Sequence, residues 1–149
     1  MESNLADAVY FAIAAHTTQK YGEYPYAIHL AEVAWLLSAR GYGAQTQSVA
    51  WLHDVLEDTD KDISLIALMF GDAIAKSVDT LTRRDGESYN DYLERIAKSG
   101  DVDALAVKKA DIECNLNKTD MDLLERPSDA ALLKRKKKYT DARDYLNDV

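Results

Sequence analysis

Long stretches of helix-forming residues, nearly free of glycine and proline, constrain this chain more than any other feature of its sequence. Only 6 Gly and 2 Pro occur among the 149 residues, and proline inside a helix removes a hydrogen bond and kinks or breaks it. Apolar residues also recur at the spacing of a helix face, as Ile63, Ile66, Ala67 and Phe70 do. The sequence therefore predicts an all-α fold of about seven or eight helices, with no sheet.

Capping residues and helix breakers predict where these helices begin and end. Ser3, Ser88 and Ser128 are the expected N-caps of the first helix, a middle helix and the last helix. A loosely defined linker is expected over residues 121–127. The predicted helices span about residues 3–20, 26–40, 44–54, 63–70, 72–81, 88–98, 102–115 and 129–146.

Length and composition restrict the class of protein. The 149 residues predict a single domain over residues 1–149. The net charge of −8 argues against a general nucleic-acid or membrane-surface binder, because phosphates and anionic lipids repel an acidic chain. Cys114 is the one cysteine and cannot form an internal disulfide. The start of the chain lacks a signal-peptide pattern, and no apolar run reaches the roughly 20 residues of a membrane span. We expect a cytoplasmic protein, and the sequence indicates no oligomeric state.

Residues 51–60 change from an apolar helix into a row of potential ligands and acids. If the helix continues through this stretch, His53 lies above Glu57, and Asp54 lies above both Glu57 and Asp58. A divalent cation would offset the charge of such crowded carboxylates. The alternative interpretation is a solvated, acid-rich helix end in an acidic protein.

Other polar residues on predicted helices could complete a metal site. His29, His53, Asp54 and Asp111 each have apolar neighbours, where an unpaired polar group is costly. Mixed imidazole and carboxylate ligands suit Mn, Fe or Zn, and the absence of a thiolate cluster weighs against structural zinc. We interpret His16, on the apolar stripe of the first helix, as a hydrogen-bonded structural histidine.

Four motifs in order make the chain similar to a known family. They are Ala15-His16-x-x-Gln19-Lys20, Pro25-Tyr26-x-x-His29, His53-Asp54-x-x-Glu57-Asp58-Thr59 and Lys109-Ala110-Asp111-x-x-x-Asn115. Together they resemble the HD phosphohydrolase superfamily, and within it the hydrolase domain of RelA/SpoT-type enzymes and the small alarmone hydrolases. The resemblance covers roughly residues 5–115 and implies a compact HD-domain helical bundle.

The resemblance also implies a catalytic apparatus. Its metal ligands would be His29, His53, Asp54 and Asp111, holding one divalent ion, usually Mn²⁺. Glu57 and Asp58 match the acidic pair that orients and deprotonates the attacking water, and their alternative role is helix-end solvation or support of the ligands. The family reaction removes pyrophosphate from the 3′ position of guanosine tetra- or pentaphosphate.

A substrate with this many phosphates requires a locally basic pocket. The candidate substrate-binding residues are Lys20, Tyr24, Arg83, Tyr89, Lys108, Asn115 and Tyr139, with Arg84, Arg95 and Tyr92 as further candidates. Each tyrosine taken alone is more simply explained by helix packing. The basic run at residues 134–138 is interpreted as a solvated face.

Departures from the family pattern concern the loops that would select a substrate. The loop between Gln19 and Pro25 lacks consecutive basic residues, and Thr82-Arg83-Arg84 replaces a more acidic stretch. His29 is followed by leucine rather than proline, and Ile112-Glu113 replaces a Lys-Leu pair.

The sequence thus predicts a nucleotide phosphohydrolase that acts on (p)ppGpp-type alarmones. One alternative is an HD-type phosphohydrolase of another nucleotide, such as a deoxynucleoside 5′-monophosphate. The other is a non-catalytic nucleotide-binding HD module.

Overall fold

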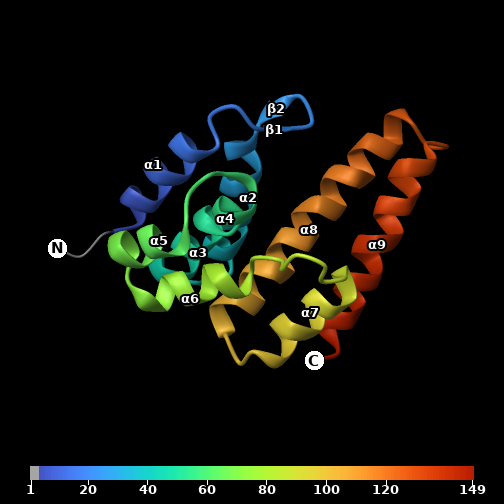
Figure 1. Ribbon diagram of the computed structural model, residues 1–149. Helices are drawn as coiled ribbons and strands as arrows, with labels where there is room; N and C mark the ends of the chain where they lie inside the picture. Colours follow the sequence, from blue (N-terminus) through green and yellow to red (C-terminus); the bar gives the residue numbers. More distant parts are fainter. Residues whose placement is uncertain (1–3) are drawn as a thin grey trace.

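Helices make up most of the structure, a computed structural model that describes residues 4–149 (Figure 1). Eight of them have eight residues or more, and α4 is a single turn, which confirms the all-α prediction for the described residues. The helices are α1 (Leu5–Ala15), α2 (Tyr26–Ala39), α3 (Ala44–Leu52), α4 (Val55–Asp58), α5 (Ile63–Phe70), α6 (Asp72–Thr80), α7 (Tyr89–Lys98), α8 (Val102–Glu125) and α9 (Ala130–Asn147).

A small antiparallel hairpin of β1 (Lys20–Tyr21) and β2 (Tyr24–Pro25) corrects the prediction of no sheet. Its tight turn contains Gly22, whose φ of 62° favours glycine. Strands of two residues are too short to show an alternating pattern in the sequence. The first helix also ends earlier than predicted, at Ala15 rather than near Lys20, where β1 begins.

Helix caps explain most of the other boundaries. Asn4 caps α1, since its side chain accepts from the Asp7 N–H while the Asp7 carboxylate accepts from the Asn4 N–H. The predicted cap Ser3 lies outside the described residues. Ser88 caps α7 as predicted, whereas Asp129 rather than Ser128 caps α9. The predicted linker over residues 121–127 is wrong up to residue 125, because α8 continues to Glu125.

The long helix α8 connects two apolar clusters. Ala104, Val107 and Ala110 belong to the main core, which the helices from α1 to α7 also form. Ile112 and Leu116 face a second cluster with residues of α7 and α9. Figure 1 shows α8 between the N-terminal helices and α9. The side chains along α8 therefore point toward both halves of the structure.

Within residues 4–149, no helix is both long enough and apolar enough to cross a bilayer.

Candidate active site

His53 and Asp54 lie in a short turn between two helices, not within one continuous helix. α3 ends at Leu52 and α4 begins at Val55, and Asp54 adopts φ −103° and ψ 1° between them. The predicted stacking of His53 above Glu57 on one helix face is therefore wrong. Nδ1 of His53 lies 2.6 Å from the Ala50 carbonyl oxygen and must donate to it. Nε2 of the same ring is buried beside the carboxylates of Asp54 and Asp111, which raise the pKa of His53 well above its usual range although burial acts to lower it.

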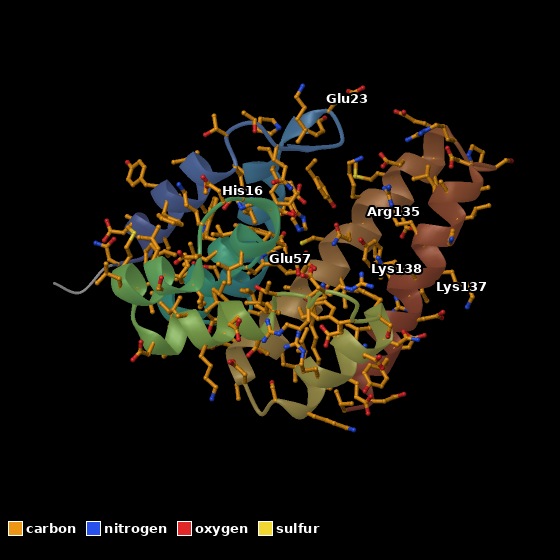
Figure 2. The ribbon with its side chains drawn as sticks, viewed as in Figure 1. His16, Glu23, Glu57, Arg135, Lys137 and Lys138 are labelled. Carbon is orange, nitrogen blue, oxygen red and sulfur yellow. The ribbon has the colours of Figure 1, made fainter. Side chains whose placement is uncertain are left out.

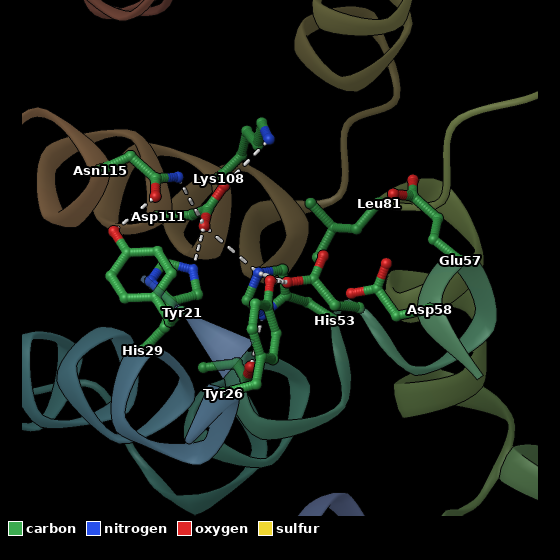
Figure 3. A network of polar contacts seen from close by, with 12 residues as sticks. Tyr21, Tyr26, His29, His53, Glu57, Asp58, Leu81, Lys108, Asp111 and Asn115 are labelled. Carbon is green, nitrogen blue, oxygen red and sulfur yellow. Dashed lines mark hydrogen bonds and ion pairs between the residues drawn. The ribbon is translucent and has the colours of Figure 1, made fainter. Parts of the chain in front are cut away.

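His29 and Asp111 reach the same point from α2 and α8. Nε2 of His29 lies 2.7 Å from Oδ1 of Asp111. Nε2 of His53 lies 3.4 Å from that same oxygen and 3.1 Å from Oδ2 of Asp54. Figure 3 shows the rings of His29 and His53 directed toward Asp111. Three segments far apart in the sequence thus bring two imidazoles and two carboxylates together.

This group has the chemistry of a possible metal site. One potential ligand atom each from His29, His53 and Asp54 lies within 4.8 Å of the other two. Because Nδ1 of His53 donates to Ala50, Nε2 is the nitrogen that would bind a metal, with release of its proton. Although burial acts to raise it, the neighbouring imidazole of His53 lowers the pKa of Asp54 to about 2, so this carboxylate is ionised at neutral pH. The residues therefore fit a divalent cation with mixed nitrogen and oxygen ligands.

Polar neighbours fix the two carboxylates. Nζ of Lys108 donates to Oδ2 of Asp111 at 3.0 Å, and Nδ2 of Asn115 donates to Oδ1 at 3.3 Å. The hydroxyl of Tyr26 donates to Asp54. Such outer contacts orient ligands and set their basicity. The sequence analysis assigned no role to Tyr26, because nothing in its spacing relates it to Asp54.

Glu57 and Asp58 lie on α4, beside the cluster of candidate metal ligands. Asn115 and Tyr21 lie on the opposite side of that cluster (Figure 3). The Arg83 backbone N–H donates to Oε1 of Glu57, and Nε2 of Gln19 donates to Oδ2 of Asp58 at 2.9 Å. Burial, together with the Asp54 carboxylate, raises the pKa of both Glu57 and Asp58 above the usual range. Each carboxylate keeps one oxygen that makes no hydrogen bond within residues 4–149.

His16 supports the same region and is buried, as expected of a structural histidine. Its Nδ1 lies 3.0 Å from Oε1 of Gln19, so one glutamine joins His16 to Asp58. The ring centroid of His16 lies 5.1 Å from that of Tyr26.

A cleft of about 850 Å³ opens beside these residues. Asp54, Glu57 and Asp111 line it, and so do all seven predicted substrate-binding residues, Lys20, Tyr24, Arg83, Tyr89, Lys108, Asn115 and Tyr139. Lining residues that the sequence analysis missed include Tyr21, Tyr26, Lys118, Arg126, Arg135 and Lys138.

The basic run on α9 is exposed, as the interpretation as a solvated face expects, but two of its residues, Arg135 and Lys138, also line the cleft. Figure 2 shows Arg135 and Lys138 on the side of α9 toward Glu57, and Lys137 directed away. Lys137 instead pairs with Asp141 at 2.8 Å. Arg135 and Lys138 share a helix face with Tyr139, and this spacing was the available signal.

Cations surround the ring of Tyr89 in this cleft. The ring centroid lies 4.3 Å from Nζ of Lys138, 5.7 Å from Nζ of Lys108 and 6.0 Å from Cζ of Arg83. Burial and the neighbouring cations lower the pKa of Lys138, as expected where positive charges gather with little compensation.

Arg84 and Arg95, the other two arginines predicted to bind substrate, instead make hydrogen bonds and ion pairs within and next to the loop between α6 and α7. Arg95 donates to the carbonyls of Thr80 and Thr82 at 2.9 and 3.0 Å and pairs with Glu87 at 2.8 Å. Arg84 pairs with Asp79 at 2.9 Å. Neither residue is among those that line the cleft.

Comparison with known proteins finds similar sequences over most of the chain. The family model described as "HD domain" matches residues 8–113. A probable guanosine-3′,5′-bis(diphosphate) 3′-pyrophosphohydrolase of Synechocystis sp. is 32% identical over 121 residues, which cover 74% of this chain and 16% of the relative. The guanosine-3′,5′-bis(diphosphate) 3′-pyrophosphohydrolase of Aquifex aeolicus is 43% identical over 75 residues, 49% of this chain and 11% of the relative.

A solved structure has the same fold. It is described as a metazoan ortholog of SpoT that hydrolyzes ppGpp, and it matches with a TM-score of 0.72 at 22% identity, over 97% of this chain and 92% of its own. The chain spans about a sixth or less of the two curated relatives. The family model, in contrast, covers most of this chain and includes the His53-Asp54 pair, His29 and Asp111. The chain therefore belongs to the HD domain family.

Proposed function

We propose that this protein is a metal-dependent phosphohydrolase that removes the 3′-pyrophosphate from (p)ppGpp-type alarmones. The observation that carries the proposal is the convergence of two imidazoles and two carboxylates beside the Glu57-Asp58 pair, at the wall of a cleft with uncompensated cations. The names of the curated relatives supply the substrate class.

In this proposal His29, His53, Asp54 and Asp111 hold one divalent ion, which we take to be Mn²⁺. When bound, such an ion polarises a phosphoryl oxygen and lowers the pKa of water. The Ala50 carbonyl accepts the Nδ1–H of His53, so Nε2 is the nitrogen that would face the ion. Lys108 and Asn115 hold Asp111, and Tyr26 holds Asp54.

Glu57 and Asp58 orient the attacking water and accept its proton. Their oxygens without hydrogen bonds are the acceptor atoms, since Arg83 N–H and Gln19 hold the other two. A raised pKa suits this role, because a general base works best when its pKa approaches the operating pH.

Cations along the cleft would neutralise the phosphates of the substrate. Lys118 is paired with Asp122 and Arg126 with Asp129. Within residues 4–149, however, Lys20, Arg83, Arg135 and Lys138 have no carboxylate within 4.0 Å. Tyr24, Tyr89 and Tyr139 offer rings for stacking, and Lys108 and Asn115 lie nearest the carboxylates. Free cations at several places along one cleft favour a substrate with separated phosphate groups.

The test is Mn²⁺-dependent turnover of a nucleotide panel, with products separated by chromatography. The panel holds ppGpp, pppGpp, ppApp and deoxynucleoside 5′-monophosphates. Pyrophosphate and GDP from ppGpp, lost in Glu57→Ala, would support the alarmone hydrolase. Phosphate release from a monophosphate would instead indicate another nucleotide substrate, and no turnover of any member would favour a non-catalytic binding module. A cytoplasmic location and a single domain over residues 1–149 stay predictions.

A further inference from the structure

Tyr21 connects the hairpin to the candidate metal centre through its ring. The side chain leaves β1 and stacks on the imidazole of His29, with ring centroids 4.5 Å apart and an angle of 23° between the planes. A stack of this kind opposes rotation of the imidazole about its side-chain bonds. The plane of His29 therefore depends on a residue from a different element.

The hydroxyl of Tyr21 makes a second connection to the same centre. It donates to Oδ1 of Asn115 at 2.8 Å, and Nδ2 of Asn115 donates to Oδ1 of Asp111 at 3.3 Å. That oxygen lies 2.7 Å from Nε2 of His29. The contacts form a closed circuit from Tyr21 through Asn115, Asp111 and His29 back to the Tyr21 ring (Figure 3).

The surroundings of Tyr21 keep both contacts in place. Burial, and next the nearby Asp111 carboxylate, raises the pKa of the Tyr21 hydroxyl above its usual range, so it is a donor at any physiological pH. Gly22 follows at φ 62°, and an added Cβ there would lie 3.3 Å from Nζ of Lys118. The turn therefore lies close against α8, the helix that carries Asn115 and Asp111.

We propose that Tyr21 is a positioning residue of the metal centre, holding the plane of His29 by stacking and the carboxylate of Asp111 through Asn115. The inference rests on the proposed metal site, but not on the identity of the nucleotide. Contacts of this outer kind typically change metal affinity by about 10- to 100-fold when they are removed.

The experiment measures Mn²⁺ affinity of the purified full chain by titration, with free Mn²⁺ followed by electron paramagnetic resonance. Tyr21→Phe keeps the ring and removes the hydroxyl, and Tyr21→Leu removes both. We expect binding about tenfold weaker in Tyr21→Phe and weaker still in Tyr21→Leu. Tyr10→Phe is the matched control, because Tyr10 lies on α1 away from the cleft and its side chain is exposed; its affinity should equal that of the wild type.

A double-mutant cycle separates the relay from a general loss of structure. In the Asn115→Ala background the hydroxyl of Tyr21 has lost its acceptor, so Tyr21→Phe should have no further effect on Mn²⁺ affinity. Thermal unfolding without metal checks that Tyr21→Phe remains folded, and this variant carries the test if Tyr21→Leu does not fold.

The outcomes separate this inference from the proposed function. Wild-type affinity in both Tyr21→Phe and Tyr21→Leu would overturn the positioning role. A wild-type protein that binds no Mn²⁺ would overturn the metal site and this role together. A protein that binds Mn²⁺ and responds to Tyr21→Phe, yet leaves ppGpp intact, would support the role of Tyr21 while contradicting the alarmone as substrate.

Discussion

Asp111 makes more polar contacts than any other candidate metal ligand. Among these contacts, the ion pair with Lys108 contributes most to stability. Both side chains are buried, with 7% and 10% of their surfaces exposed. Although burial acts to lower it, the Asp111 carboxylate raises the pKa of Lys108 well above its usual range. The ammonium thus stays charged inside the protein and depends on Asp111 for compensation.

Without added metal, Asp111→Ala should lower the free energy of unfolding by about 3–5 kcal/mol, because it leaves a buried charge without a partner. The double variant Asp111→Ala, Lys108→Met should recover most of this loss. Urea unfolding followed by circular dichroism measures both. Equal losses in the single and double variants would contradict the dependence of Lys108 on Asp111.

Lys138 and Lys137 are neighbours with opposite surroundings, and together they test the cationic side of the cleft. Lys138→Ala should raise KM for ppGpp by roughly fivefold, about 1 kcal/mol, with a smaller change in kcat. Lys137→Ala should leave both unchanged, since Lys137 faces solvent and pairs with Asp141. Steady-state kinetics at two salt concentrations measure the effect, which should shrink as salt screens the charge. Equal changes in both variants would assign the effect to the net charge of the chain.

At the scale of elements, the sequence predicted correctly those helices whose bounds depend only on local apolar spacing and capping residues. α5, α6 and α7 begin and end close to the expected residues because apolar stripes, Asp62 and Ser88 specify them locally. The break between α3 and α4 at His53-Asp54 is different, because there Asp54 makes a tertiary contact with Tyr26 of α2. Spacing in the sequence cannot report contacts between α2, α8 and this turn, so the order of motifs, not periodicity, led to the candidate ligands.

The loop between α6 and α7 depends on the Arg95–Glu87 pair. Hydrogen bonds from Arg95 lower the pKa of Glu87 from its usual 4.5 to about 2. A carboxylate with a lowered folded-state pKa stabilises the fold above its unfolded-state pKa, and this contribution disappears as the pH falls through the folded-state value.

Glu87→Gln should therefore destabilise the protein at pH 6 and have a progressively smaller effect as the pH falls from about 4.5 toward 2. Urea unfolding of both proteins across this range gives the difference at each pH. A difference that stays constant with pH would show that the charge of Glu87 does not contribute.

At the scale of the whole molecule, metal binding and folding stability are linked. An ion that binds only the folded chain stabilises it by about 2.7 kcal/mol at a free concentration 100 times Kd. Mn²⁺ should therefore raise the Tm, and a chelator should reverse the rise. Asp54→Asn should remove the response while α-helical circular dichroism is retained. The same Tm increase in this variant would place the ion elsewhere.

The charge of the whole molecule opposes the charge of its cleft. With a net charge of −8, long-range repulsion of an anionic substrate is expected, and the cations around Tyr89 act within the cleft at short range. Association should accordingly become faster as salt first screens the chain, before the local contacts weaken.

The two walls of the cleft differ in how they are held. Both apolar clusters hold α8 between Ala104 and Leu116, whereas the hairpin that faces it joins only two pairs of residues. Backbone amides in the middle of α8 should thus exchange with deuterium only when the whole protein unfolds, and the amides of residues 20–25 through brief local openings. Each such opening would also release the Tyr21 ring from His29 and its hydroxyl from Asn115, while Lys108 on the same helix still holds the Asp111 carboxylate.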